Sequence, residues 1–317
     1  MSAVRLHRYD EQLAMGHSPR AVASAVAAQR LVRVRPGIYA DGETWAAATP
    51  ETRLVARARA LALVSKVPPV FSHETAAAAH RLPLFHPRTD AVHVIVSAER
   101  PGAAAGAVRH RGELRNEDVV EIDGLRCTSL DRTVADMART GTFEQAVAVT
   151  DAALRALCVP RPGEYLLDRA NEFRKTARDI ARRSAHGRTQ AERVLAFADG
   201  RAQLPGESIS RIRLHELGFR RVRLQVRVSG PGGTNYYADF GLDDVGALAE
   251  FDGALKYTDG QLRDGRTTAE VFDREKQRED WIRGKSQLRF VRWGWPHIRT
   301  AQTLADRLVA FGIRPPS

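Results

Sequence analysis

The segment that constrains the fold most runs from about Thr189 to the end of the chain. Two stretches have the apolar spacing of helices, TQAERVLAFADG and PGESISRIRLHELGF, and Gly218 ends the second one. Three strand-like runs follow, VRLQVRV, YYADFGL and GALAEFDG, with GPGGTN as a turn after the first. A charged helix, DREKQREDWIRGK, and a final strand, RFVRWGW, complete the pattern. The order helix, three strands, helix, strand predicts a mixed α/β domain over residues 188–317.

Acidic residues lie in or next to two of these strands. Asp239 lies in YYADFGL, and Glu250 and Asp252 lie two residues apart in ALAEFDG, so the latter two project from the same face of a strand. If the two strands are neighbours joined by the GLDDVG turn, their carboxylates meet. Converging carboxylates repel one another unless a cation lies between them, and hard oxygen ligands suit Mg²⁺ or Mn²⁺. We therefore expect Asp239 and Glu250 to bind a divalent metal, which polarises a phosphodiester and lowers the pKa of a bound water.

Further charged residues nearby fit the same chemistry. Glu207, which begins the preceding helix, and Asp252 would support the metal directly or through water. Lys256 follows in a position to stabilise developing charge or to orient the nucleophile. The spacing also allows another interpretation, in which Asp252-Gly253 is a turn and Glu250 is a solvated residue that protects a sheet edge.

Six motifs follow one another in this part of the chain: GESISRIRLHELG, LQVRV, YYADFGL, ALAEFDGALKY, EKQRED and RFVRWGW. In this order they resemble the small PD-(D/E)XK nuclease-fold domain related to very-short-patch-repair endonucleases. The positions that match the family pattern are Glu207, Gln225, Asp239, Phe240, Glu250, Asp252 and Gly253. The resemblance implies that Gln225 and Lys256 position the water or the phosphate. Many relatives have histidine where this chain has Lys256.

The first forty residues predict two helices followed by a hairpin. A short amphipathic segment, RLHRYDEQLAMG, precedes HSPRAVASAVAAQ, in which Ser18 is placed as N-cap and Pro19 as the first helical residue. The run LVRVRPGIYA alternates and turns at Pro36-Gly37. This is the layout of a winged helix-turn-helix in residues 1–70, and the alternative is a small helical cap with a solvated hairpin. In the first interpretation four arginines meet DNA phosphates: Arg20, Arg30, Arg33 and Arg35.

The charge of the chain favours a polyanionic partner. The formal net charge is +11 and the pI is about 10.3, and nucleic acid is the commonest cytosolic polyanion. A basic balance also arises without such a partner in Arg-rich chains from GC-rich genomes. The charge alone does not separate these two explanations.

The middle of the chain predicts a mixed α/β domain. Strand-like runs are AVHVIV and VRHRGEL, and VVEIDGLRCT has a hairpin turn at Asp123-Gly124. Two amphipathic helices follow, SLDRTVADMAR, with Ser129 as N-cap, and FEQAVAVTDAALRAL. A polar, Arg-rich stretch after Cys158 predicts a helical connector that ends near Gly187. We assign residues 71–187 to this domain and its connector.

Three residues of FSHETAAAAHRL have metal-binding side chains: His73, Glu74 and His80. The two histidines are seven residues apart, which places them two helical turns from each other. We therefore interpret them as structural histidines rather than as metal ligands.

Three upstream motifs, SPRAVASAVAAQRLVRVRPGIYA, SHETAAAAHRLPL and DGLRCTSLDRTVADMAR, resemble the AbiEi-type antitoxin region of actinobacterial proteins. Such proteins carry an N-terminal winged helix and often end in the nuclease-like domain. The resemblance implies DNA binding, transcriptional self-regulation, and a cognate toxin or a repair or defence protein as partner.

Length and composition bound the remaining possibilities. A chain of 317 residues predicts two or three domains, and two cysteines, Cys127 and Cys158, cannot form a disulfide framework or a four-thiolate zinc site. The chain has no apolar signal core at its start and no run of membrane-spanning length, so we expect a soluble cytoplasmic protein.

Together these patterns predict a multidomain α+β or α/β protein. It would have an N-terminal winged helix, a mixed α/β middle domain and a C-terminal restriction-endonuclease-like mixed sheet with flanking helices. The expected function is DNA binding with Mg²⁺- or Mn²⁺-dependent DNA endonuclease activity. The alternative is a non-catalytic, antitoxin-like transcriptional regulator that uses a degenerate nuclease fold to bind DNA or a partner.

Overall fold

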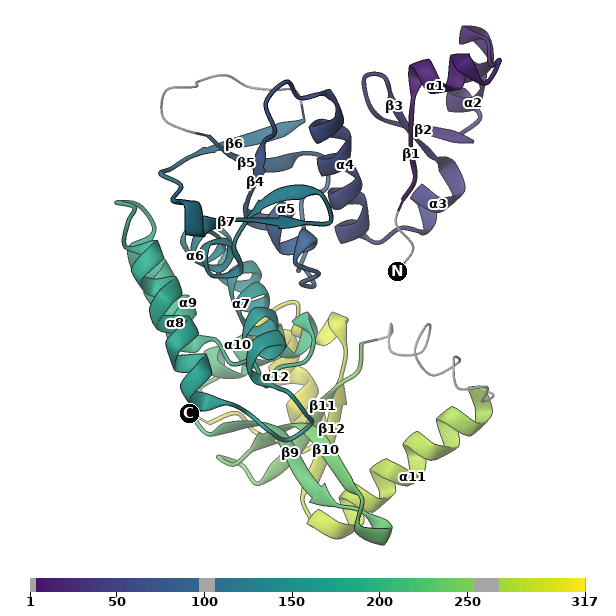
Figure 1. The fold of residues 1–317 in the computed structure, drawn as a ribbon. Helices are drawn as coiled ribbons and strands as arrows, with labels where there is room; N and C mark the ends of the chain where they lie inside the picture. Colours follow the sequence, from purple (N-terminus) through teal and green to yellow (C-terminus); the bar gives the residue numbers. More distant parts are fainter. Residues whose placement is uncertain (1–3, 97–105, 254–267, 317) are drawn as a thin grey trace. The chain divides into compact units, whose positions relative to one another are not determined.

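The chain is a mixed α/β protein of the multidomain α+β class, with three separate sheets (Figure 1). This computed structural model describes residues 4–96, 106–253 and 268–316. The chain divides into two compact units, one of residues 1–153 and 171–198 and the other of residues 154–170 and 199–317.

Unit 1 begins with a small sheet and the helices around it. The elements are β1 (Leu6–Arg8), α1 (Tyr9–Ala14), α2 (Pro19–Ala27), β2 (Leu31–Arg35), β3 (Ile38–Asp41), α3 (Gly42–Ala47) and α4 (Pro50–Val64). The strands pair antiparallel in the order β1-β3-β2. The predicted N-cap is confirmed, because Ser18 Oγ accepts a hydrogen bond from Ala21 N at 3.2 Å. Val34, Ile38 and Ala60 belong to one buried cluster that joins the sheet to α4.

A five-stranded sheet forms the rest of the core of unit 1. Its strands are β4 (Val70–Phe71), β5 (Val92–Val96), β6 (Ala107–Arg111), β7 (Val119–Ile122) and β8 (Leu125–Thr128), in the order β6-β5-β4-β8-β7. The pairs β5–β6 and β4–β8 are parallel, and the pairs β4–β5 and β7–β8 are antiparallel. The predicted hairpin turn is confirmed: Asp123 and Gly124 have φ values of 48° and 80°, as a two-residue hairpin loop requires.

Helices lie between and after the strands of this sheet along the chain. They are α5 (His73–Ala79), the 3₁₀ helix η1 (Asn116–Asp118), α6 (Leu130–Thr140), α7 (Phe143–Cys158), α8 (Leu167–Ala181) and α9 (Arg188–Phe197). The fully buried Leu54, Phe71 and Cys127 lie in one cluster with residues of α5. Helix α9 packs against α6 within unit 1, whereas the sequence analysis placed its residues with the C-terminal segment.

Unit 2 is built on a four-stranded sheet. Its elements are α10 (Pro205–Glu216), β9 (Val222–Ser229), η2 (Pro231–Gly233), β10 (Asn235–Leu242), β11 (Ala247–Phe251), α11 (Thr268–Ser286), β12 (Arg289–Trp293), η5 (Trp295–Ile298) and α12 (Ala301–Ala310). The strand order is β12-β11-β10-β9, with β11 and β12 parallel and the other pairs antiparallel. The predicted order of helix, three strands, helix and strand is confirmed, and α12 adds a helix that the sequence analysis did not predict.

The sheet of unit 2 is irregular where the predicted site residues lie. The β9–β10 register passes from Val226↔Ala238 to Leu224↔Phe240, and Gln225 between them has a φ of 52°. The register is the same on both sides of Gln225, so the positive φ marks a local distortion of the strand without an inserted residue, which the pattern VRLQVRV did not indicate. The β10–β11 pairing ends at Phe240↔Ala249. Asp239 and Glu250 are the next two residues in register and lie just beyond the paired region.

Within the described residues, none of the helices has the length and apolar character that crossing a bilayer requires.

Candidate functional site

A glutamine links the first two predicted carboxylates of unit 2. Gln225 Nε2 lies 3.3 Å from Glu207 Oε2 and 3.5 Å from Asp239 Oδ1, so this side chain contacts α10 and β10 together. Gln203 supports the arrangement: its Nε2 donates to Gln225 Oε1 at 2.8 Å and its backbone N donates to Glu207 Oε2 at 2.9 Å. Glu207 is completely buried. The side chains of Glu207, Gln225 and Asp239 are therefore ordered by one another.

The side chain of Asp239 accepts a backbone hydrogen bond at the end of β11, as a backbone carbonyl of a neighbouring strand would do. Its Oδ2 accepts the backbone N–H of Phe251 at 2.9 Å, just beyond the last recorded β10–β11 pair. The side chain thus holds the end of β11 and is itself buried. Burial is the main reason why the pKa of Glu250 is raised, and the nearby charge of Asp239 adds to that increase.

Glu250 is a buried carboxylate between two arginines. Arg278 of α11 donates to Oε1, and Arg292 of β12 lies 2.9 Å from Oε2. Burial nevertheless raises the pKa of Glu250 to about 7, and the opposing effect of the two guanidinium groups does not cancel it. At neutral pH a substantial fraction of this group therefore carries a proton.

The two arginines are shared with acidic residues of α11. Arg278 Nε lies 3.2 Å from Glu275 Oε2, Arg292 Nη2 donates to Glu275 Oε1, and Arg292 Nε lies 3.3 Å from Glu279 Oε2. The charged helix of the sequence thus packs its charges onto Glu250. The sequence analysis did not predict this arrangement, because it treated DREKQREDWIRGK only as a charged helix.

The other predicted residues of unit 2 are placed less centrally. Strand β11 ends at Phe251, so Asp252 lies beyond the strand rather than on it with Glu250, and its backbone N donates to Trp293 O at 2.8 Å. Asp252 is partly buried. Lys256 lies outside the described residues.

The donor chemistry at Asp239 and Glu250 fits Mg²⁺ or Mn²⁺, which proteins often hold through one or two carboxylates with water completing the shell. Metal binding here requires a change of partners, because both carboxylate oxygens of Glu250 already contact arginines. A cation at this position requires Glu250 to exchange Arg278 or Arg292 for the metal. Glu207 and Gln225 would then contact the metal's water rather than the ion itself.

The predicted DNA-contacting arginines lie in unit 1 on or beside α2 and β2. Arg20 is in α2, Arg30 lies between α2 and β2, and Arg33 is in β2; all three are exposed, whereas Arg35 at the end of β2 is partly buried. Within the described part of the chain, no ion pair is recorded for Arg20, Arg30 or Arg33. Their charges are thus available to a partner.

The structure brings together three histidines that the sequence analysis did not connect. The ligand nitrogens of His73, His93 and His110 all lie within 4.8 Å of one another, and no other such group of His, Cys, Asp or Glu occurs among the described residues. The residues come from α5, β5 and β6, and only the sheet order β6-β5-β4 brings them close. The interpretation of His80 as structural agrees with its contact to the carbonyl of Thr128 at 2.9 Å, whereas His73, which received the same interpretation, belongs to the histidine cluster.

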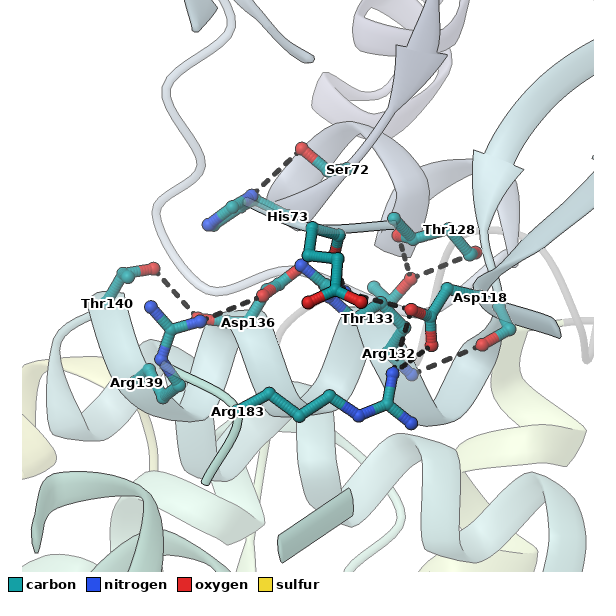
Figure 2. Close-up of polar contacts among 12 residues, drawn as sticks. Ser72, His73, Asp118, Thr128, Arg132, Thr133, Asp136, Arg139, Thr140 and Arg183 are labelled. Carbon is teal, nitrogen blue, oxygen red and sulfur yellow. Dashed lines mark hydrogen bonds and ion pairs between the residues drawn. The ribbon is translucent and has the colours of Figure 1, made fainter. Parts of the chain in front are cut away.

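A buried ionic network lies at α6 (Figure 2). Arg132 Nε donates to Asp136 Oδ2 at 2.9 Å and its Nη1 donates to Asp118 Oδ2 at 3.1 Å. Arg183 and Arg139 pair with the same two carboxylates, at 2.9 Å and 3.1 Å. Two carboxylates therefore offset two of the three guanidinium charges, and such a network is weak evidence for stability because the cost of desolvation opposes the attraction.

Comparisons with known proteins give related chains without an assigned activity. No family model matches the chain. Two Mycobacterium tuberculosis proteins, described as uncharacterized proteins MT2308 and Rv2248, are each 28% identical over 222 residues, which is 70% of this chain and 73% of theirs. The crystal structure of the RV2827C protein from the same species covers 60% of this chain and 75% of its own, with 13% identity and a TM-score of 0.34, too low to support an argument about the fold.

Proposed function

We propose that this chain is a DNA-binding protein whose residues 199–317 carry a metal-dependent centre for phosphodiester hydrolysis. The convergence of Glu207, Gln225, Asp239 and Glu250, from four separate elements, carries the proposal. These positions match the PD-(D/E)XK pattern that the sequence resembles. Asp239 and Glu250 would hold Mg²⁺ or Mn²⁺, and such an ion, when bound, lowers the pKa of a water and stabilises charge on the phosphate.

The residues of the chain have distinct roles in this proposal. Gln225 is already oriented by Gln203 and Glu207, so its amide is placed to hold a water or a phosphate oxygen near Asp239. Glu207 orients Gln225 and supports the metal through water. Lys256, by resemblance, would stabilise charge that develops on the phosphate.

DNA binding is proposed for residues 1–70. Two helices, α1 and α2, precede the hairpin β2–β3, and the sheet order is β1-β3-β2, an arrangement that suits a winged helix-turn-helix with α2 as recognition helix. Arg20 on α2 and Arg33 on β2 expose their side chains. Their contacts would go to phosphates, which position the protein without reading sequence.

A second function is supported by the arginines on Glu250. Arg278 and Arg292 supply the positive charge that a metal would otherwise provide. On this alternative the nuclease-like unit is non-catalytic, and the protein is an antitoxin-like regulator that binds DNA or a cognate partner.

Cleavage assays on the full chain separate the two functions. Supercoiled plasmid, mismatched duplex and single-stranded DNA would each be incubated with the protein and Mg²⁺ or Mn²⁺. We expect metal-dependent nicking by the wild type and its loss in Asp239→Asn and Glu250→Gln. Glu279→Gln is the matched control, because Glu279 is a neighbouring carboxylate that contacts Arg292 but is not a proposed ligand. DNA binding without cleavage of any substrate would favour the regulator.

A further inference from the structure

The histidine cluster of unit 1 has the composition and geometry of a metal site. His93 Nδ1 lies 2.9 Å from His110 Nε2, and the rings of His73 and His110 stack with centroids 3.5 Å apart. His93 and His110 lie on the paired parallel strands β5 and β6, while His73 begins α5. Three imidazoles from three elements therefore meet in one place.

The outer nitrogens of two of these rings have oxygen partners. His73 Nδ1 lies 2.9 Å from Ser72 Oγ, which leaves Nε2 as the nitrogen available to a ligand. His93 Nε2 lies 3.8 Å from Glu74 Oε2, and Nδ1 faces His110. Metal-binding histidines commonly donate their second N–H to an oxygen acceptor, which fixes the ring orientation and tautomer. Ser72 lies within hydrogen-bond distance of His73, whereas Glu74 must move closer to His93 to accept such a bond.

The carboxylate beside His93 is itself held in place. Glu74 Oε2 accepts the backbone N–H of Arg88 at 3.1 Å, and Oε1 accepts Gln145 Nε2 at 3.2 Å. A carboxylate fixed by two donors is a rigid outer partner for a histidine ligand.

We propose that His73, His93 and His110 bind one transition-metal ion of the Zn²⁺ class, with Glu74 as the outer partner of His93. Imidazole ligands select zinc and its neighbours rather than Mg²⁺. Zinc–nitrogen bonds of about 2.0–2.1 Å put tetrahedral ligand nitrogens roughly 3.3 Å apart, so forming the site requires the nitrogens to draw together and the stacked rings of His73 and His110 to separate and turn their edges toward the ion. Three protein ligands leave a fourth position for water or a small ligand.

The protonation state of the cluster suits metal binding. Burial lowers the pKa of all three histidine rings, and the pKa of His110 falls to about 4. Each ring therefore offers a lone pair at neutral pH. The proton shared by His93 Nδ1 and His110 Nε2 moves, on binding, to an outer ring nitrogen, and for His93 this nitrogen faces Glu74. The ion thus takes the position of the shared proton, and the number of protons on the histidine rings does not change.

Positive charge near the cluster is partly compensated. Arg132 and Arg139 act on His73 and oppose a further cation. Both arginines, however, pair with Asp136 at 2.9 Å and 3.1 Å, and Arg132 also pairs with Asp118 (Figure 2). The ionic network at α6 therefore offsets part of the charge that these arginines bring to the histidines, because Asp118 also pairs with Arg183.

The test is a metal titration of the full chain after treatment with a chelator. Zn²⁺ binding would be measured by calorimetry, and Co²⁺ would serve as a spectroscopic probe because tetrahedral nitrogen coordination gives visible absorption. We expect one equivalent to bind and His110→Gln to weaken binding more than tenfold. His110 lies on the edge strand β6 and is only partly buried, so this variant is the one least prone to misfold. Glu74→Gln should weaken binding by about tenfold, as loss of an outer partner does.

Two controls make the result specific. His17→Gln removes an exposed histidine elsewhere in unit 1 and should leave the titration unchanged. Glu250→Gln should also leave Zn²⁺ binding unchanged, which separates this site from the proposed nuclease centre. Absence of stoichiometric Zn²⁺ and Co²⁺ binding, or binding that His110→Gln does not weaken, would overturn the proposal.

Discussion

At the scale of single residues, Glu250 has the clearest measurable consequence. Its pKa in the folded protein is about 7, above the ordinary value of 4.5, so the folded state binds a proton more tightly than the unfolded state between these pH values. The contribution of Glu250 to the free energy of unfolding is therefore fully present below about pH 4.5. It is lost as the pH rises through 7, by roughly 3 kcal/mol at 1.36 kcal/mol per pKa unit. We predict that the wild type loses more unfolding free energy than Glu250→Gln between pH 5 and pH 7.5.

Urea unfolding of both proteins at the two pH values measures this difference. The comparison must be made against Glu250→Gln, because other groups also titrate in this range: burial raises the pKa of Glu74 and lowers that of His93. These groups are common to both proteins and cancel in the difference. Parallel pH dependences would show that Glu250 is not held at a raised pKa.

At the scale of elements, two helical glycines form a matched pair. A methyl group on Gly206 of α10 would lie 2.0 Å from a ring carbon of the buried Phe251, whereas one on Gly284 of α11 would meet no atom within 4 Å. We predict that Gly206→Ala lowers the free energy of unfolding by about 1–3 kcal/mol through overpacking. Gly284→Ala should raise it by about 0.5–1 kcal/mol through helix propensity. Thermal unfolding of both variants tests this, and equal effects would mean that α10 is not docked on Phe251.

The arginines of α2 and β2 give a prediction about DNA binding. If Arg20 and Arg33 contact phosphates, their joint replacement by alanine should reduce the slope of log K against log salt by about two units. The matched control is Arg169→Ala with Lys175→Ala, which removes the same charge from exposed positions on α8. Fluorescence anisotropy with one duplex over a range of salt concentrations gives both slopes. A similar reduction in the control would assign the effect to net charge rather than to this surface.

Elements whose determinants are local were predictable from the sequence. Ser129 Oγ accepts Arg132 N at 3.4 Å at the start of α6, and the turn at Asp123-Gly124 depends only on residues that tolerate positive φ. The same reasoning located Asp239 and Glu250 at one place in the sheet of unit 2, because antiparallel neighbours joined by a short turn must meet.

Features that depend on tertiary packing were not predictable in this way. The histidine cluster requires β5 and β6 to pair in parallel and α5 to lie beside them, and no local pattern specifies such pairing. The partners of Glu250 depend on how α11 docks, which the sequence pattern of a charged helix leaves open. The positive φ of Gln225 interrupts the regular strand where its side chain contacts Glu207 and Asp239, and these partners come from other elements.

At the scale of the whole molecule, the chain enters unit 2 twice. Residues 154–170 belong to unit 2, residues 171–198 belong again to unit 1, and residues 199–317 complete unit 2. Within unit 2, Gly200 lies so close to Leu154 that a methyl group would be 2.7 Å from its backbone, and Arg201 lies 5.2 Å above the ring of Tyr165. We predict that a fragment of residues 154–317 melts at least about 5 °C above a fragment of residues 199–317, a difference of roughly 2 kcal/mol. Circular dichroism during heating measures both, and equal midpoints would show that the earlier segment adds nothing to the stability of unit 2.

The division of the chain also sets an order of events during protein synthesis. Residues 154–170 leave the ribosome before the last strand and helix of their own unit exist, and the remaining chain of about 150 residues takes roughly 7–30 s to make at 5–20 residues per second. Leu154 and Cys158, which are completely buried in the finished protein, stay without their final neighbours for that time. Newly made chains are therefore most exposed to aggregation and to chaperone binding at this short segment, after unit 1 has become able to fold and before unit 2 can.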